Sequence, residues 1–416
     1  MQLDHGTGTL RLPVPLLKLA MDNITHTVVG LAVGEVIHRA VTAEATPAAQ
    51  HTRRRLLLTA CAAASNFPDL DLVLGGLLPN PLGYLLHHRG HTHTLLLEIP
   101  QALLLVALLW LLWPNARALL NTSTAARKGL ALAVIAGFLL HIGMDAMNSY
   151  GVHPFYPFDM RWLFGDLVFI VEPIFWVGAG VPLIMTIDRG WLRRGWLVLL
   201  ALVLTGFTIK GYLHWASLAL LALAALLAAR QGLPTGLALC VAFISVQALG
   251  SHTARGLLAG ELAQRAPGAR LLDAALTAYP ANPLCWNFAA IERTAGQDNY
   301  HVRRGVLSLA PALLPVEACP AGLTGQVEGR GRIGLLSDDA ASLAVLRSRA
   351  GADCWLRAWM RFARVPLLVD GVASDLRFGT RLAPNFSTID LDTFKGRGCP
   401  APVPPWGTPR MDLLAP

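Results

Sequence analysis

The feature that most constrains this sequence is a series of apolar segments, roughly 17–25 residues long, that recur as far as residue 250. A helix of that length crosses the hydrocarbon core of a bilayer. Only 14% of the residues are charged, whereas a soluble domain carries about 25%. The sequence therefore predicts an all-α polytopic membrane protein with about seven or eight transmembrane helices. The expected segments are residues 24–39, 56–66, 94–113, 129–147, 167–187, 195–209, 213–229 and 233–250. The second is too short to span a bilayer by itself, and an extension through Leu70–Leu78, broken at Pro68, would give a kinked or re-entrant element.

After Ser251 the sequence becomes mixed and polar, with Arg, Asp and Pro scattered throughout. This change predicts a soluble α+β domain, which is large enough to bury its own core. Strands are expected at 286–291 and 300–309, a helix at 343–364, and a hairpin at 366–378 with Asp370-Gly371 at its turn. An amphipathic stretch near 253–277 precedes them. The predicted domains are residues 21–190 (metal-site membrane domain), 191–252 (additional transmembrane helices) and 253–416 (C-terminal domain).

The first twenty residues contain two prolines, no sustained apolar run and no small-residue cleavage pattern, so they do not read as a signal peptide. Met21 opens a more regular segment. We therefore expect residues 1–20 to be a disordered tail or an extension upstream of a true start at Met21.

Ionisable side chains gather near the ends of the first five apolar segments. If successive segments alternate in direction, all of these residues lie at one membrane face. Ionisable residues in membrane segments are costly to bury and usually functional. The group comprises His26, Asp69, Asp71, His87, His88, His91, His93, His141, Asp145, Asp166 and Glu172.

Basic loop residues mark the opposite face. Because positively charged loops stay in the cytoplasm, we expect a bacterial inner-membrane protein whose polar cluster and C-terminal domain face the periplasm. These loops also explain the net charge of +8, and no basic stretch is interleaved with aromatic residues, so no nucleic-acid partner is expected. The loop residues are Arg39, Arg53, Arg54, Arg55, Arg117, Arg127, Lys128, Arg189, Arg193, Arg194 and Arg230.

The cysteines test the same topology independently. Cys61 and Cys240 lie in apolar segments and are expected to be packing residues. The C-terminal domain holds four widely spaced cysteines without a Cys-x-x-Cys pair, which disfavours a zinc ribbon. Two disulfides formed in an oxidising compartment are expected, with three possible connectivities. The four residues are Cys285, Cys319, Cys354 and Cys399.

The strongest local signal is the run from His87 to Thr94, which contains four histidines. Neutral imidazole is the commonest ligand for zinc and similar transition metals. The run could instead be a surface tract that binds metal adventitiously. His141 and Asp145 add a pair that stacks on one helix face, although a simple His–Asp hydrogen bond between segments is the alternative.

Asp69 and Asp71 place two carboxylates on the same side of an extended or turn segment. One could bind metal while the other orients a histidine; the alternative is that an Asp caps the following helix. His26 is as well explained by packing as by metal binding. Zinc is the expected ion, with iron or manganese as alternatives, and one or two ions fit the residue set.

Arg89, within the histidine run, is suited to clamping a phosphate or carboxylate in two places. Metal-assisted hydrolysis also needs a base, which a spare carboxylate can supply. Arg89 and Asp71 are therefore the catalytic candidates. Asp166, Glu172 and His91 are secondary candidates for the site.

Five short motifs follow one another along the membrane part of the chain. They are Met21-Asp22-x-x-Thr25-His26, Pro68-Asp69-x-Asp71, His88-Arg89-Gly90-x-Thr92-His93-Thr94, His141-x-x-x-Asp145 and Asn148-x-Tyr150-Gly151. This order resembles the bacterial membrane-bound metal-dependent hydrolase family, described as LexA-binding, inner-membrane-associated hydrolases. The segment from Gly165-Asp166 to Glu172-Pro173 looks like that family's acidic segment, with Glu in place of the more usual Asp. The resemblance covers roughly residues 21–190 and implies six metal-site residues: His26, Asp69, His88, His93, His141 and Asp145.

Three functions remain open at this point. The first, which we favour, is a hydrolase at the outer membrane face that acts on a phosphate-bearing or lipid-linked ester. Its expected partners are membrane lipids and a small-molecule or lipid-linked substrate. The second is a metal or proton-coupled transporter, but such sites lie near the midplane and often accompany internal repeats, which are not visible here. The third is a non-catalytic scaffold with a ligand-saturated structural metal. The sequence does not specify an oligomeric state.

Overall fold

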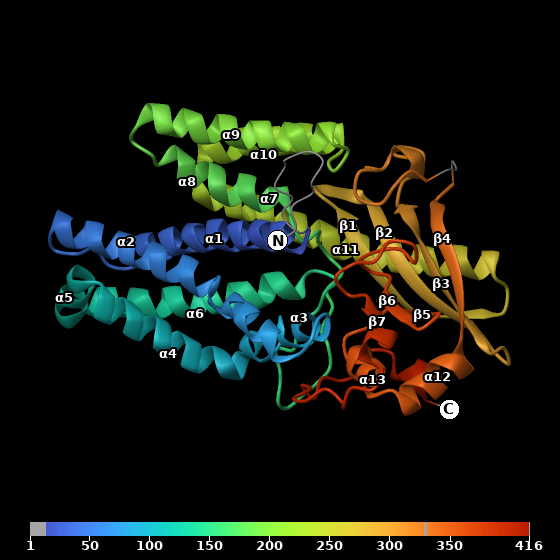
Figure 1. Ribbon diagram of the computed structural model, residues 1–416. Helices are drawn as coiled ribbons and strands as arrows, with labels where there is room; N and C mark the ends of the chain where they lie inside the picture. Colours follow the sequence, from blue (N-terminus) through green and yellow to red (C-terminus); the bar gives the residue numbers. More distant parts are fainter. Residues whose placement is uncertain (1–13, 328–330, 416) are drawn as a thin grey trace, which may run out of the picture.

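A computed structural model describes residues 14–327 and 331–415 of the chain. The long helices run roughly side by side in a bundle, and a C-terminal domain built on antiparallel sheets lies at one end of it (Figure 1). The helical elements are α1 (Val14–Ala40), α2 (Pro47–Ala64), the 3-10 helix η1 (Phe67–Leu77), α3 (Leu82–His87), the 3-10 turn η2 (His91–His93), α4 (Leu95–Leu112), α5 (Pro114–Thr122), α6 (Thr124–Ala146), α7 (Pro173–Phe175), the π-helical turn η3 (Trp176–Gly180), α8 (Val181–Met185), α9 (Gly190–Ile209), α10 (Trp215–Gln231) and α11 (Leu233–Arg265).

Helices occupy all eight predicted apolar segments, but they differ in their capacity to span a membrane. Within the described residues, five stretches are long and apolar enough to cross a bilayer, fewer than the predicted seven or eight. Two shorter apolar helices, Pro173–Met185 and Trp215–Gln231, occupy the fifth and seventh predicted segments. The five spanning stretches are Pro47–Leu77, Leu95–Leu112, Thr124–Ala146, Gly190–Ile209 and Leu233–Arg265.

The two ends of the helical bundle differ in chemistry, as the alternation of segments predicts. The polar residues on η1, α3 and the last turn of α6 lie at the end that meets the C-terminal domain (Figure 1). The links between α1 and α2 and between α8 and α9, together with α5, lie at the far end (Figure 1). Most of the basic residues lie in these segments or in the helix turns near them. The polar cluster and the basic loops are therefore at opposite ends of the bundle.

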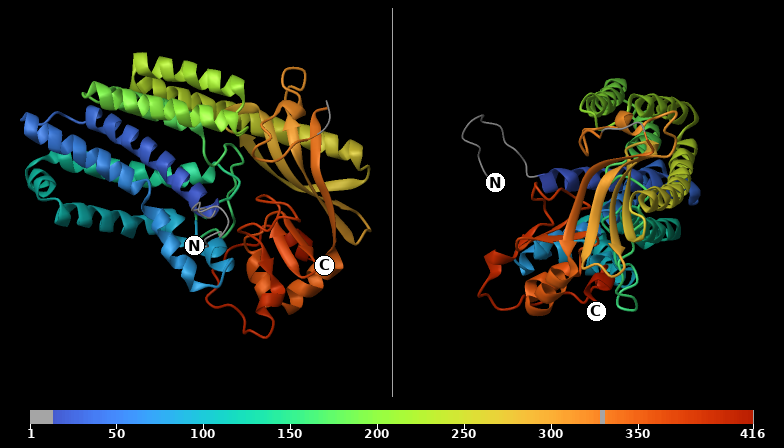
Figure 2. Two further views of the ribbon diagram at one scale, coloured as in Figure 1. Left: turned by 45° about the horizontal axis from the view of Figure 1, so that its top comes forward. Right: turned by 90° about the vertical axis from the view of Figure 1, so that its right-hand side faces the viewer.

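The C-terminal domain contains a four-stranded antiparallel sheet in the order β1-β2-β3-β4 and a three-stranded sheet in the order β5-β6-β7. Figure 2 shows the larger sheet curving away from the helical bundle, with α11 along one face. The elements are β1 (Ala269–Tyr279), β2 (Asn282–Thr294), β3 (Asn299–Ser308), η4 (Val316–Ala318), β4 (Ile333–Ser342), α12 (Leu343–Ala352), α13 (Cys354–Met360), β5 (Pro366–Val369), β6 (Val372–Asp375), β7 (Ile389–Asp390), η5 (Leu391–Phe394) and α14 (Met411–Leu414).

Both faces of the four-stranded sheet are buried. Because side chains alternate along a strand, one set of residues points to each face. On one face, Leu258 of α11 packs with strand residues such as Phe288. On the other, Val302 packs with Trp359 of α13. The second face is the one turned toward the smaller sheet.

The predicted strands, hairpin and disulfides are confirmed. At the hairpin, Asp370 and Gly371 have φ angles of 51° and 81°, which the tight turn between β5 and β6 requires. Of the three possible connectivities, the disulfides are Cys285–Cys319 and Cys354–Cys399. Cys61 and Cys240 are buried free thiols.

Two helices extend across the predicted domain boundaries. Helix α11 runs through the boundary expected at residue 253 and ends at Arg265. Its polar end remains helical because Ala254, Leu258 and Leu262 recur every four residues and pack against the sheet. At the N-terminus, residues 1–13 lie outside the described part of the chain, and α1 already begins at Val14.

Candidate metal centre

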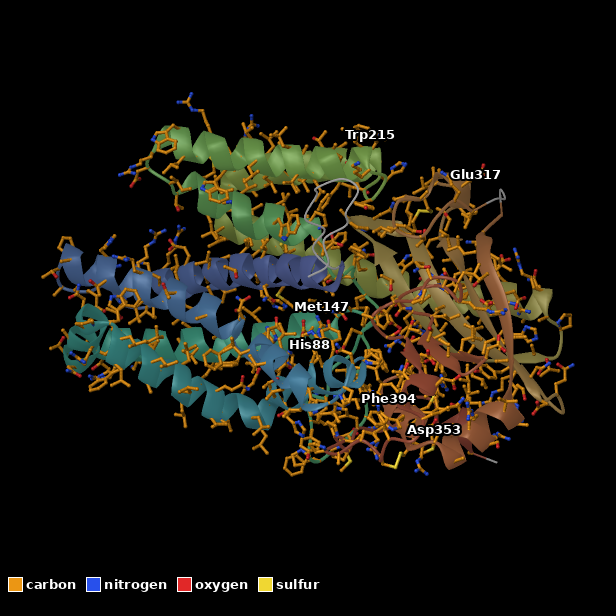
Figure 3. The ribbon with its side chains drawn as sticks, in the orientation of Figure 1. His88, Met147, Trp215, Glu317, Asp353 and Phe394 are labelled. Atoms are coloured by element: carbon orange, nitrogen blue, oxygen red, sulfur yellow. A yellow bond between two sulfur atoms is a disulfide. The ribbon has the colours of Figure 1, made fainter. Side chains whose placement is uncertain are left out.

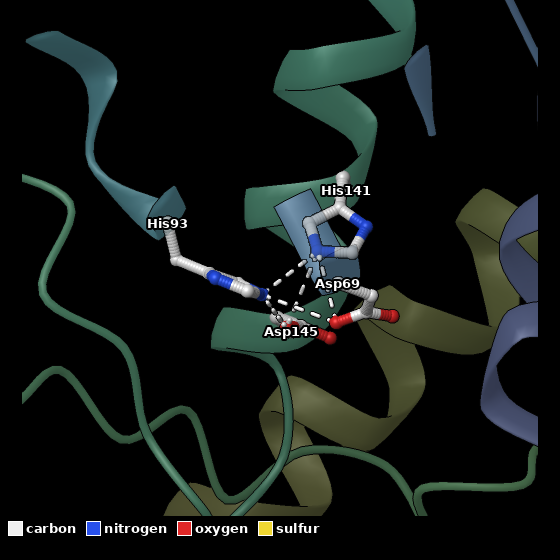
Figure 4. A group of neighbouring side chains, drawn as sticks. All are labelled: Asp69, His93, His141 and Asp145. Atoms are coloured by element: carbon white, nitrogen blue, oxygen red, sulfur yellow. Dashed lines mark hydrogen bonds and ion pairs between the residues drawn. The ribbon is translucent and has the colours of Figure 1, made fainter. Parts of the chain in front are cut away.

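Four buried side chains converge at the end of the bundle that meets the C-terminal domain. Asp69 lies in the first turn of η1, His93 ends η2, and His141 and Asp145 lie one turn apart on α6. Each is at most 7% exposed. Their potential ligand atoms all lie within 4.8 Å of one another (Figure 4). Three segments distant in sequence therefore supply one compact group.

The separations within this group match the coordination shell of a small cation. His141 Nε2 lies 2.9 Å from His93 Nε2 and 3.7 Å from Asp69 Oδ1 and from Asp145 Oδ2. His93 Nε2 lies 3.4 Å from Asp69 Oδ1 and 3.3 Å from Asp145 Oδ2. Tetrahedral ligands bound at 2.0–2.1 Å are about 3.3–3.4 Å apart. The five separations that involve a histidine nitrogen are therefore close to those expected around one ion of the size of zinc.

The hydrogen bonds outside the group fix which ring nitrogens face its centre. His141 Nδ1 lies 2.7 Å from the carbonyl oxygen of Ser65, which can only accept, so this nitrogen carries the proton. His93 Nδ1 lies 3.0 Å from the hydroxyl oxygen of Thr92 and 3.3 Å from Asp71 Oδ2. In the neutral rings both Nε2 lone pairs then point inward.

Two inward lone pairs and two carboxylates repel one another unless a cation, or a proton on His93 Nε2, lies between them. The pKa of His93 reports this concentration of negative charge. Burial lowers it, but the carboxylates of Asp71, Asp145 and Asp69 raise it by more, so that it stands well above its usual value. The donor set of two imidazoles and two carboxylates is one that zinc, iron and manganese accept.

Asp69 also belongs to a second group, with Asp71 and His88. Asp71 Oδ1 lies 3.1 Å from His88 Nδ1. Asp71 Oδ2 accepts hydrogen bonds from the Arg89 backbone N–H at 3.0 Å and from the Thr92 hydroxyl at 2.8 Å. Asp71 thus holds two histidines at once, a common way in which metal sites orient their ligands. The geometry matches the expectation that one Asp faces the metal while the other orients a histidine.

The second oxygen of Asp145 is held by two further candidates. Arg89 Nη2 lies 2.9 Å from Asp145 Oδ1, and His26 Nε2 lies 3.3 Å from it. Arg89 also donates to Asn148 Oδ1 at 3.0 Å. His26 packs its ring 4.4 Å from that of His141. In this arrangement both residues position Asp145, and the Arg89 guanidinium is engaged by protein groups.

A cavity of about 190 Å³ adjoins the cluster where the helical bundle meets the C-terminal domain. His88, whose place at this junction Figure 3 shows, lines it together with Arg89. The Arg89 guanidinium lies 5.1 Å from the centre of the Tyr150 ring, another lining residue. The C-terminal domain contributes Arg304 of β3, Thr277 and Tyr279 of β1, and Asn287 of β2 to the lining. The cavity therefore connects the metal cluster to the C-terminal domain.

The structure places the three secondary candidates away from the metal-binding groups. Asp166 forms ion pairs with Arg255 at 2.7 Å and Arg364 at 2.9 Å. Glu172 caps α7 and accepts a hydrogen bond from the Ala281 N–H at 2.9 Å. His91 is half-buried against Trp406, with ring centres 4.7 Å apart. The two carboxylates connect the membrane part to the C-terminal domain.

Sequence reasoning missed Asn148 as part of the site. Its side chain accepts from Arg89 and from the Tyr150 backbone N–H at 2.8 Å, so it locks the turn that follows α6. The motif Asn148-x-Tyr150-Gly151 includes this residue, but the motif does not indicate that Asn148 binds Arg89. Arg304 was also missed, because its strand gives no local sign of a cavity more than 200 residues from the histidine run.

With this geometry described, the relatives of the chain can be considered. A family model described as YdjM inner membrane protein matches residues 21–254, which is more than half of the chain and includes every residue of the metal-binding groups. The chain belongs to the YdjM inner membrane protein family. This family membership agrees with the apolar spans in placing the protein in a membrane.

One curated relative and the solved structures complete the comparison. The chain is 29% identical over 157 residues to the Bacillus subtilis (strain 168) protein named "Uncharacterized protein YfhP". The matched stretch spans 38% of this chain and 43% of the relative, so the chain covers less than half the length of that relative. No solved structure matches the chain. The expected hydrolase activity therefore rests on the site itself.

The contacts of Asp71 with His88 and His93 lead to a prediction about metal affinity. The Asp71→Asn substitution keeps the size of the side chain but removes the negative charge that interacts with His88 and His93. We expect metal affinity to fall roughly 10- to 100-fold, as is typical when such an orienting partner is lost. Competition with a chromogenic chelator measures the change. Asp188→Asn, at an exposed position near the basic end, is the control, and equal affinities for the two variants would rule out an orienting role for Asp71.

Proposed function

We propose that this protein is a membrane-bound metal-dependent hydrolase that cleaves a phosphate-bearing or lipid-linked ester at the periplasmic membrane face. The observation that carries the proposal is the position of the buried His/Asp cluster beside a cavity at the junction of the two domains. A bound ion there would supply Lewis acidity and lower the pKa of a water molecule. Among the described residues, the sets of side chains that could hold an ion are this cluster and the adjoining group that shares Asp69 with it.

The two ligand groups differ in a way that favours catalysis over a purely structural metal. Structural sites are closed by four protein ligands, whereas catalytic sites keep a position open. The group of Asp69, His93, His141 and Asp145 supplies four ligands, but the group of Asp69, Asp71 and His88 supplies only three. His88 lines the cavity. The three-residue group therefore leaves room for water and substrate on the cavity side.

Side chains around the cluster hold the candidate metal ligands in position. Asp71 and Thr92 hold the Nδ1 proton of His93, while Arg89 and His26 hold Asp145. Burial of the cluster keeps bulk water away from these charges and strengthens their interactions.

The periplasmic orientation is supported by two independent features. Disulfides persist in oxidising compartments, and the C-terminal domain holds two of them. The basic loops lie at the far end of the bundle, where the positive-inside rule expects the cytoplasm. Both features favour a site that opens on the outer side of the inner membrane.

A hydrolysis screen tests the proposal. Protein purified in detergent is expected to cleave at least one member of a panel of phosphoesters, acyl esters and phospholipids. Chelation should abolish this activity and added metal should restore it, whereas His141→Ala should reduce it at least 100-fold because it removes a ligand from the buried group. Metal-loaded protein that cleaves nothing in the panel, with wild type and His141→Ala indistinguishable, would contradict the hydrolase assignment and favour a structural metal.

A further inference from the structure

The wall of the cavity formed by the C-terminal domain carries an arginine that the metal centre does not use. Arg304 lies on β3, directly opposite Ala289 of β2 and Ser337 of β4. Successive side chains of a strand point to opposite faces of the sheet, so the Arg304 side chain points to the same face as that of Val302, two positions earlier. This face is turned away from α11. This is the face that lines the cavity.

Arg304 is buried, and two of its nitrogens lack a partner within residues 14–327 and 331–415. Its residue is 6% exposed, and its Nε and Nη1 atoms are buried with no hydrogen-bond partner among the described residues. Asp339 acts on it through its charge without forming an ion pair among those described. Burial lowers the pKa of Arg304, which Asp339 and Tyr279 partly oppose, yet a guanidinium stays charged at neutral pH. A buried cation of this kind is costly unless an anion accompanies it.

The other two arginines that line the cavity are already engaged. Arg89 is paired with Asp145 at 2.9 Å. Arg377 pairs with Asp375 at 2.7 Å and donates to the carbonyl oxygen of Ser149 at 2.7 Å. Arg304 differs from both because its Nε and Nη1 atoms have no such acceptor in the part of the chain that the structure describes.

Polar atoms next to Arg304 extend the same surface. Asn287 faces the cavity from β2, and its Oδ1 atom is buried without a hydrogen-bond partner among the described residues. Thr277, which pairs with Asn287 across β1 and β2, and Tyr279 contribute hydroxyl groups to the same wall. The Asn287 Nδ2 group and the two hydroxyl groups can donate hydrogen bonds to an oxyanion, whereas Asn287 Oδ1 can only accept. The cavity of about 190 Å³ holds roughly six water-sized groups, which is room for a phosphate group.

We propose that Arg304, together with Asn287 and Thr277, forms a subsite of the C-terminal domain that binds the phosphate-type oxyanion of the substrate. This inference rests on the proposed hydrolase function and assigns the C-terminal domain the task of recognising the substrate. A guanidinium fork matches the geometry of two phosphate oxygens. Phe169, Ile170 and Phe386 line the same cavity and suit an apolar portion of the ligand. That portion can come from a lipid or from a soluble phosphate ester.

Equilibrium dialysis of the detergent-purified full chain against radiolabelled inorganic phosphate tests the subsite. Arg304→Gln should weaken phosphate binding roughly 10- to 100-fold, the usual worth of a lost charge-assisted hydrogen bond. Arg304→Lys keeps the positive charge but lacks the two-pronged guanidinium, so its phosphate affinity should lie between those of the wild type and Arg304→Gln. Arg270→Gln, at an exposed position on β1 of the same sheet, removes the same charge and should bind phosphate normally. Metal content and melting temperature, measured on each sample, show that the folded metal centre persists.

Competition experiments identify the source of the anion. Displacement of labelled phosphate by phosphatidic acid in phosphatidylcholine nanodiscs, but not by phosphatidylcholine alone, supports the subsite with a lipid headgroup as ligand. Displacement by glycerol 3-phosphate alone supports it with a soluble ester. Equal phosphate binding by wild type and Arg304→Gln, or equal loss in Arg270→Gln, overturns the proposal. Phosphate binding that depends on Arg304 in a protein that hydrolyses nothing would leave the subsite standing and refute the hydrolase function separately.

Discussion

Replacing His93 or His141 with alanine is expected to leave the purified protein with little bound metal. Each substitution removes one of the four atoms that converge within 4.8 Å. The remaining carboxylates of Asp69 and Asp145 then face each other with one imidazole in place of two. Mass spectrometry of metal content per chain, after dialysis against a weak chelator, measures the effect. We expect a loss of at least one bound ion per chain in each variant.

His91 supplies a matched control from the same histidine run. It lies two positions from His93, but its ring packs on Trp406 and Tyr156 outside both metal-binding groups. His91→Ala should therefore retain the metal of the wild type. If metal content fell equally in His91→Ala and His93→Ala, the histidine run would be an adventitious metal-binding tract rather than part of a built site.

The substitution Asp166→Asn is expected to lower the free energy of unfolding by about 3 kcal/mol, the low end of the cost of breaking a buried ion pair. Asp166 accepts from Nη1 and Nη2 of Arg364, each at 2.9 Å, and both residues are buried. The asparagine leaves the Arg364 guanidinium with Asp273 as its remaining charged partner, at 2.8 Å. Chemical denaturation followed by tryptophan fluorescence measures the change. Metal content should persist, because Asp166 lies outside the metal-binding groups.

Asp159→Asn is the control in the same loop. Asp159 pairs with Arg161, whose side chain is 86% exposed, and exposed ion pairs contribute little to stability. We expect no measurable change. A similar effect of the two substitutions would show that the buried network does not hold the domains together.

The same network makes stability depend on pH. Burial raises the pKa of Asp273, but Arg364, Arg410 and Arg255 lower it by more, so the net pKa is below its usual value. Its stabilising contribution is therefore complete at neutral pH and is lost as the pH falls below about 3.9, the unfolded-state value. Denaturation midpoints measured from pH 7 down to pH 3 should show this decline.

The sequence was sufficient for the features that depend on local pattern. Apolar length located the helices, and alternation placed the polar residues at one end of the bundle. The Asp370-Gly371 turn located a hairpin because few residue pairs accept two positive φ angles. The number of spans was less well predicted, because segments such as Trp215–Gln231 are apolar but short.

The sequence could not predict interactions between the membrane part and the C-terminal domain. Asp166 resembled a ligand because an acidic residue near a membrane segment is usually functional. Its partner, Arg364, lies 198 positions away, and no local pattern connects the two. Arg304 was missed for the same reason. The geometric roles of Arg89 and His26 beside Asp145 likewise depend on how three helical segments meet.

X-ray absorption spectroscopy of the metal-loaded protein tests the central claim most directly. The predicted spectrum shows a four-coordinate ion with nitrogen and oxygen ligands at about 2.0–2.1 Å, including two imidazoles and no sulfur. Because Cys61 and Cys240 are the free thiols and lie outside both ligand groups, a sulfur shell at about 2.3 Å would contradict the assignment. A spectrum with water oxygens and no imidazole would contradict it as well.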